Sequence, residues 1–330
     1  MILSPPILAL LSGSFLVVLI LLYATWYGLQ IIRHWDIRSG SELQISLERR
    51  TYLISTIMSH ALGFQLLSLF LFIYTADQLS SSFTGAMCAA GALNVNRFGY
   101  PALLLKILNF MAGGVWLVIN ATDNSAPDYP LIRKKYMFLL PIGVLITIEA
   151  FLQGCYFLGL KPDIITSCCG TLFSSAADDS GALAAPPRYW PAAGYYFFAF
   201  LTLGTGALFY TRQKGAYLFS LSSTFLFLFS CLALVFYISP YLYELPTHHC
   251  PFCILHREYT FVGYPVYLLF LAGGVSGLGV GAISPFTGVR SLRETLPRIR
   301  AELTAVCLIS WSAALVISSW AILTSNLKMD

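Results

Sequence analysis

Eight long apolar runs dominate the sequence and decide what the chain can fold into. Each run has about 20 residues or more, the length that an α-helix needs to cross the ~30 Å hydrocarbon core of a bilayer. Only 10% of the 330 residues are charged, whereas soluble domains carry about 25%. The runs cover residues 6–32, 51–76, 99–121, 136–160, 191–211, 216–239, 260–284 and 303–324. The sequence therefore predicts an all-α, multi-pass membrane protein with eight transmembrane helices, in contact with lipid and with no nucleic-acid partner.

The basic residues between the runs predict the orientation. Most of the 19 Lys and Arg residues lie in the linkers after the first, third, fifth and seventh runs, at Arg33, Arg38, Arg49, Arg50, Arg133, Lys134, Lys135, Arg212, Lys214, Arg290, Arg293, Arg298 and Arg300. Because positive charge favours the cytoplasmic side, these linkers are predicted inside and both termini outside. The first run is too long for a signal-peptide core and is predicted to remain as a span. We expect a bacterial inner-membrane protein whose other loops face the periplasm.

Two similar segments lie about half a chain apart. FGYPALLLK begins at Phe98 and VGYPVYLLF begins at Val262; each is followed by AGGV. The GYP elements are 164 residues apart. This spacing predicts a tandem repeat of two four-helix units, 1–165 and 166–330, although short small-residue patterns are also common in membrane helices. The second unit would carry the outer loop 161–190 and the CPFC loop 240–259.

Five of the eight cysteines fall in the predicted outer loops, at Cys88, Cys168, Cys169, Cys250 and Cys253. If the protein is bacterial, this side of the membrane is oxidising, and thiol pairs there can form disulfides. The other three cysteines lie inside the apolar runs, where they are predicted to be packing residues.

The sharpest motif is THHCPFCILHREY, residues 247–259. Taken as the start of the seventh helix, it puts Cys250 near the N-cap, Cys253 one turn in, and Arg257 four residues further along the same face. The helix dipole and a nearby cation both lower the pKa of a thiol. His249 or His256 could add positive charge or transfer a proton. The motif therefore predicts a redox-active pair.

The element Cys250-Pro-Phe-Cys253-Ile-Leu-His-Arg257 resembles the CxxCxxxR element of the DsbB family, membrane oxidoreductases that make disulfides and pass electrons to quinone. The vitamin K epoxide reductase family has a comparable CxxC at a helix end. The resemblance covers about a dozen residues, and those families have four-helix cores. It implies that Cys250 and Cys253 are the redox pair, that Arg257 contacts a quinone cofactor, and that an extracytoplasmic thiol protein is the partner. His256 is a further candidate quinone contact, and the vicinal Cys168-Cys169 could exchange with that partner.

Two other interpretations stay open. Cys88, Cys168, Cys169, His248, His249, Cys250 and Cys253 form a soft-ligand set suited to copper or zinc. Alternatively, disulfides among these cysteines fix the outer loops of a non-catalytic subunit in a larger respiratory or transport complex. The sequence leaves open whether the protein is an enzyme.

Three ionisable residues fall inside the predicted spans. Lys106 and Glu149 each lie roughly 10 Å below the outer surface and are predicted to pair, as a structural link or as part of a proton path. His60 lies near mid-membrane in the second run, where it can bond a neighbouring helix or contact a cofactor.

Overall fold

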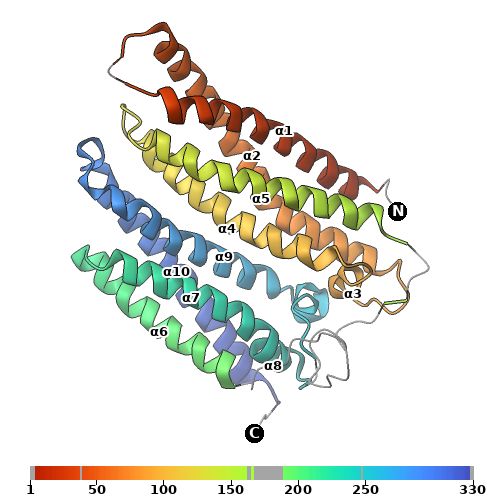
Figure 1. Cartoon of the computed structure of the whole chain (residues 1–330). Coiled ribbons are helices and arrows are strands. Elements are labelled where there is room, and N and C mark those ends of the chain that lie inside the picture. Colours follow the sequence, from red (N-terminus) through yellow and green to blue (C-terminus); the bar gives the residue numbers. More distant parts are fainter. Residues whose placement is uncertain (1–3, 38, 162–164, 167–188, 247, 328–330) are drawn as a thin grey trace. The chain divides into compact units, whose positions relative to one another are not determined.

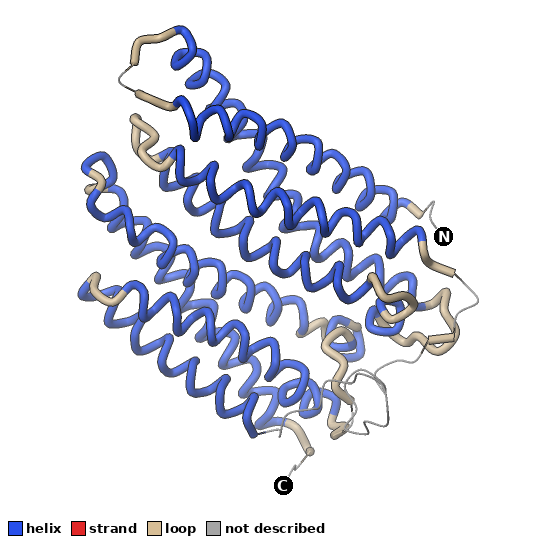
Figure 2. The backbone as a smooth tube through the Cα atoms, viewed as in Figure 1, coloured by secondary structure: helices blue, strands red, loops and turns tan. Residues whose placement is uncertain are grey.

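The computed structural model describes residues 4–37, 39–161, 165–166, 189–246 and 248–327. These residues are helical, with turns and loops between the helices and no strand among them (Figure 2). They form two compact units. Unit 1 comprises Met1–Thr75, Val95–Lys161 and Pro285–Ile299; unit 2 comprises Ala76–Asn94, Pro162–Ser284 and Arg300–Asp330.

Unit 1 is built from four long helices. They are α1 (Pro5–His34), most of α2 (Glu42–Ser80), α4 (Gly99–Asn124) and α5 (Ile132–Leu158). Helix α5 packs against both α1 and α4 (Figure 1). The core between the four helices is apolar and includes Leu21, Met58, Trp116 and Ile146, all at most 2% exposed.

Unit 2 contains four long helical segments and several short ones. The long segments are α6 (Tyr189–Arg212), α7 (Ala216–Ala233), α9 (Gly263–Ile283) and most of α10 (Thr295–Thr324). Helix α7 continues through a π-helical turn, Leu234–Ile238, into α8 (Ser239–Tyr243). The short helix α3 (Ala89–Leu93) and two 3₁₀ turns, Cys253–Leu255 and Arg257–Tyr259, complete the unit.

Glycines in α9 let it approach α7 within unit 2. A Cβ added at Gly277 would lie 2.1 Å from Ser223 Oγ, and one at Gly281 would lie 2.3 Å from Ser220 Oγ. Only a residue without a side chain fits at such distances. Helices α7 and α9 accordingly pack closely, as expected for small-residue interfaces in membrane helices.

Eight helical segments are long and apolar enough to cross a membrane, one for each predicted run. Many of their large apolar side chains, including Phe15, Trp26, Phe151 and Phe200, are exposed and available to lipid. The chain is thus a multi-pass helical membrane protein. The tandem repeat, the division at residue 165 and the side on which the termini lie stay predictions; in the structure, residues 76–94 belong to unit 2 and 285–299 to unit 1.

Candidate functional site: a buried three-cysteine cluster

The CPFC segment does not open a transmembrane helix, so this prediction was wrong. Cys253–Leu255 forms a single 3₁₀ turn, and His256 then adopts an extended conformation (φ −83°, ψ 161°). Thr260 and Phe261 have left-handed φ values of 54° and 56°, which an α-helix cannot accommodate. Helix α9 begins only at Gly263. The dipole of a spanning helix therefore does not act on these thiols in the manner predicted.

Two tyrosines of the neighbouring helices hold the CPFC loop instead. The hydroxyl of Tyr243, at the end of α8, donates to the carbonyl oxygen of Cys250 at 2.6 Å. The hydroxyl of Tyr267, in the first turns of α9, donates to the carbonyl oxygen of Pro251. The acceptors are the consecutive carbonyl groups of Cys250 and the next residue, so the backbone at the first cysteine is fixed from two helices of the same unit.

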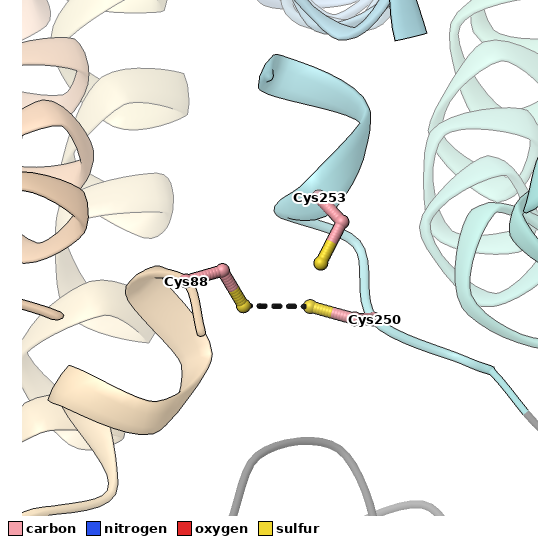
Figure 3. Close-up of side chains that lie close together, drawn as sticks. All are labelled: Cys88, Cys250 and Cys253. Carbon is pink, nitrogen blue, oxygen red and sulfur yellow. Dashed lines mark hydrogen bonds between the residues drawn. The ribbon is translucent and has the colours of Figure 1, made fainter. Parts of the chain in front are cut away.

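Three sulfur atoms meet where this loop lies beside the start of α3 (Figure 3). Cys88, the residue before α3, places its Sγ 3.3 Å from Sγ of Cys250, a cysteine 162 residues away in the sequence. The sulfurs of Cys88, Cys250 and Cys253 all lie within 4.8 Å of one another. The three residues are 0%, 1% and 9% exposed. We call this group the three-cysteine cluster.

The backbone also contributes to the cluster. The amide N–H of Phe252 points to Sγ of Cys250, with nitrogen and sulfur 3.4 Å apart. A donor in this position favours the thiolate over the thiol. The 3.3 Å between Cys88 and Cys250 is longer than the ~2.05 Å of a disulfide bond, so these two sulfurs are in contact without being bonded to each other.

A carboxylate joins the two segments that carry the sulfurs. Asp77 Oδ1, near the end of α2, accepts from the backbone N–H of Ala89 at 3.1 Å and lies 2.9 Å from Nε2 of His256. Ala89 follows Cys88 directly, and His256 lies three residues after Cys253. We call this arrangement the Asp77 bridge, because one oxygen ties the α3 segment to the CPFC loop.

The Asp77 bridge also changes the charge of His256. Burial, the largest single influence, lowers its pKa. The hydrogen bond and charge of Asp77, with smaller effects from Cys88 and Glu258, outweigh burial and raise the pKa above its ordinary 6.5. A protonated imidazole beside the cluster favours negative charge on its sulfurs.

The other predicted residues of this region lie elsewhere. Arg257 is exposed on the second 3₁₀ turn, and the extended His256 removes it from the helical face expected for Cys253. The ring of His249 lies against Phe236, and the ring of His248 lies 4.5 Å from that of Tyr243. Neither histidine belongs to the metal-ligand group found among the described residues. Cys168 and Cys169 lie outside the described residues.

The intramembrane residues lie in unit 1. Lys106 Nζ is 2.8 Å from Glu149 Oε1, and both side chains are buried. His60 is exposed on α2, with Nδ1 2.8 Å from the carbonyl oxygen of Thr56. It lines a groove of about 650 Å³ between α1 and α2, together with Gly13 and Phe64.

Several important residues were missed in the sequence. Asp77 was not predicted, although an aspartate at the end of an apolar run is itself a signal of function. Tyr243 and Tyr267 resemble the other interfacial tyrosines and carry no distinguishing pattern. Lys135 was assigned to a cytoplasmic linker; it is instead fully buried in α5 and pairs with Asp123 at 2.7 Å.

No protein-family model matches the sequence, and comparison with curated proteins and with solved structures found no match. The fold and the cluster thus define the class of protein: a multi-pass helical membrane protein with a buried three-cysteine cluster in its second unit. The similarity to the DsbB and vitamin K epoxide reductase families stays local, since it depends on Cys250, Cys253 and Arg257 alone.

Proposed function

We propose that the three-cysteine cluster is a thiol–disulfide exchange centre on the non-cytoplasmic face of the membrane. The observation that carries this proposal is the third sulfur: Cys88 lies 3.3 Å from Cys250, which is also one of the CPFC pair. Exchange requires a thiolate next to a disulfide, and a three-sulfur group provides both once two of its sulfurs are oxidised to a disulfide.

In the exchange step Cys250 is the shared sulfur. The Cys88 thiolate attacks Sγ of Cys250 in a Cys250–Cys253 disulfide, so that the Cys88–Cys250 bond forms, the Cys250–Cys253 bond breaks and Cys253 leaves as a thiolate. No electrons are gained or lost in this internal step. The Phe252 amide supports it, and so does His256 when its imidazole is protonated, because both favour negative charge near the sulfurs.

Net oxidation of a partner requires an acceptor outside the cluster. A partner dithiol that becomes a disulfide gives up two electrons and two protons, and a quinone that takes them becomes a quinol. The CxxCxxxR resemblance is the reason for proposing quinone, with Arg257 and His256 as candidate contacts in unit 2. His60, in unit 1, is a separate candidate for cofactor contact. An extracytoplasmic thiol protein is the proposed source of electrons, and Cys168 and Cys169 are the proposed pair that meets it.

A thiophilic metal site is the second candidate, and the same group favours it. Three cysteine sulfurs suit Cu(I) or Zn²⁺. Sulfurs that share a tetrahedral zinc at Zn–S 2.3 Å lie about 3.8 Å apart. The 3.3 Å between Cys88 and Cys250 is closer than this, and no histidine among the described residues joins the group. We therefore place exchange first.

Disulfide-trapping experiments on the purified full-length protein distinguish thiol–disulfide exchange from a metal site. We expect Cys253→Ser to accumulate a Cys88–Cys250 disulfide and Cys88→Ser to accumulate Cys250–Cys253, each identified by mass spectrometry of non-reduced peptides. In the wild type, both disulfides should be detected after partial oxidation with a short-chain quinone. Cys307→Ser, which changes a buried cysteine of α10, is the matched control and should leave both patterns unchanged.

The alternatives give different results. Stoichiometric copper or zinc in the isolated protein, lost together in Cys88→Ser, Cys250→Ser and Cys253→Ser, would replace the exchange proposal with the metal site. One disulfide that resists reductant and never changes partner would indicate a loop-fixing role in a non-catalytic subunit.

A further inference from the structure

Unit 1 contains two buried ion pairs that the thiol chemistry does not use. Lys106 pairs with Glu149 at 2.8 Å, and Lys135 pairs with Asp123 at 2.7 Å. All four side chains are at most 1% exposed. Ionisable side chains buried this completely are costly in a membrane protein, and an intramembrane ionisable residue is by default a candidate for function, ion and proton pathways included.

The Lys106–Glu149 pair belongs to a larger polar group. Gln65 Nε2 donates to the second carboxylate oxygen of Glu149, and Nζ of Lys106 is 3.1 Å from the hydroxyl oxygen of Ser68. Lys106 also lies 5.4 Å from the ring centroid of Phe72. The ammonium group therefore keeps two other partners when the carboxylate is neutralised.

The Lys135–Asp123 pair is similarly supported. Lys135 Nζ donates to Asn120 Oδ1 at 3.0 Å and to Ser55 Oγ at 3.2 Å. Asn120 Nδ2 in turn donates to Ser59 Oγ at 2.9 Å. This second group thus reaches one helical turn further along α2 from Ser55, towards the first group.

The register of α2 against α4 brings a further polar side chain into the first group. Ser55 meets Asn120 and Ser68 meets Lys106, so the antiparallel helices place Asn109 level with Gln65.

Asn109 is 0% exposed, and neither its amide nitrogen nor its amide oxygen has a hydrogen-bond partner in the described part of the chain. Gln65 Oε1 has none there either. Buried amides are normally satisfied by protein or water, so this level has the polar atoms to hold water.

Apolar side chains of the unit 1 core, Leu62 among them, separate the two groups. Ser59 and Gln65 are six residues apart on α2, which is about 9 Å along the axis. Leu62 lies between them, and opposite it is Gly113 of α4, where an added Cβ would stand 3.7 Å from Leu62 Cδ2. Because Gly113 contributes no side chain here, Leu62 fills this level from α2, with Leu66 Cδ2 at 3.8 Å from the same added Cβ.

We propose that unit 1 conducts protons along this line, with Asp123 and Glu149 as the groups that take up and release the proton and the Leu62 layer as the barrier between them. When a proton neutralises one carboxylate, the lysine of that ion pair keeps its hydrogen bonds to the neighbouring hydroxyl and amide groups. Water at the Gln65 and Asn109 level then passes the proton across the Leu62 layer.

Proton flux into vesicles tests the proposal. The full chain is placed in liposomes with an internal pH-sensitive dye, and a potassium gradient with valinomycin supplies the driving potential. We expect wild-type influx several-fold above that of empty vesicles and near-background influx for Glu149→Gln and Asp123→Asn. Glu48→Gln, an exposed carboxylate on α2, is the matched control and should equal the wild type.

Variants of the barrier keep the test decisive even where the ion-pair variants fold poorly. Leu62→Ser should raise the flux several-fold and Leu62→Phe should lower it, because both leave the two ion pairs intact. If the wild type and Leu62→Ser both match empty vesicles, the proposal is overturned and the ion pairs are structural. Unchanged flux in a well-folded Glu149→Gln protein would overturn it as well.

Discussion

Asp77 shows how one side chain can hold a site together. Its Oδ1 contacts both the residue after Cys88 and the histidine after the CPFC turn. The sulfurs of Cys88 and Cys250 come from segments with no local connection, so their 3.3 Å contact depends on such links. The tyrosine bonds from α8 and α9 fix only the CPFC side.

The Asp77 bridge predicts a pH-dependent stability. Because the folded-state pKa of His256 is raised above 6.5, its contribution is complete below the unfolded value and is lost as the pH rises through the folded value. Asp77→Asn should cost about 1 kcal/mol at acid pH, since it weakens a half-buried ion pair and its hydrogen bonds. Thermal unfolding in detergent between about pH 5.5 and about pH 8.5 measures this.

The variant should also flatten the pH profile. Glu258→Gln, the control, changes a carboxylate with a smaller effect on His256 and should retain most of the pH dependence. Equal profiles for Asp77→Asn and the wild type would show that the bridge does not stabilise the cluster. In the Cys253→Ser background, Asp77→Asn should reduce the yield of the Cys88–Cys250 disulfide.

At the scale of elements, the fit of α9 against α7 depends on glycine. Gly277 faces Ser223, and an added Cβ would lie 2.5 Å from Ser223 Cβ, an atom fixed to the backbone and unable to move by rotation. Helices with side chains at this point would have to separate. The packing of α9 bears on the cluster, because α9 also carries Tyr267.

The same glycine-to-alanine substitution at two different positions separates this steric effect from the effect of helix propensity. Gly277→Ala should destabilise the protein by about 1–3 kcal/mol through overpacking. Gly204→Ala lies in α6, where a Cβ meets no atom within 4 Å, and should be neutral or slightly stabilising. Thermal unfolding of both variants measures the difference; equal unfolding temperatures would contradict the close approach of α7 and α9.

The orientation of the whole chain across the membrane is predicted by its charge distribution. The basic linkers predict that the loop after α1 is cytoplasmic and that the three-cysteine cluster faces the other side. The thiol proposal requires this orientation, because cytosolic thiols are kept reduced whereas the opposite side of a bacterial inner membrane is oxidising.

Cysteine labelling in intact cells tests the orientation. Gly40→Cys, in the exposed loop between α1 and α2, should react with a membrane-impermeant maleimide only after the cells are broken. Ser81→Cys, exposed just beyond the other end of α2, should react before. The reverse pattern would place the cluster on the cytoplasmic side. It would contradict the proposal that thiol–disulfide exchange takes place on the non-cytoplasmic face.

The sequence predicted the helical elements far better than it predicted the site. Each of the eight predicted runs lies in a helix, although the helix ends differ from the predicted ones. The second helix covers Glu42–Ser80, longer than the predicted 51–76, because the polar residues before the run are also helical. CPFC failed as a helix start since the conformations of His256 and Thr260, which follow the motif, decide where α9 begins. The side chains around the thiols were predicted only in part: Cys88 and His256 were candidates, whereas Asp77 and both tyrosines were missed.

The eight apolar runs are enough to identify a helical membrane protein with eight candidate spans, because the length and hydrophobicity of a span are properties of consecutive residues. Only the tertiary structure brought Cys88 to Cys250 and Asp77 to His256, partners 162 and 179 residues apart. It also buried Lys135 against Asp123. The physical reason is that such contacts depend on which helices pack and in what register, and no local pattern of residues encodes that.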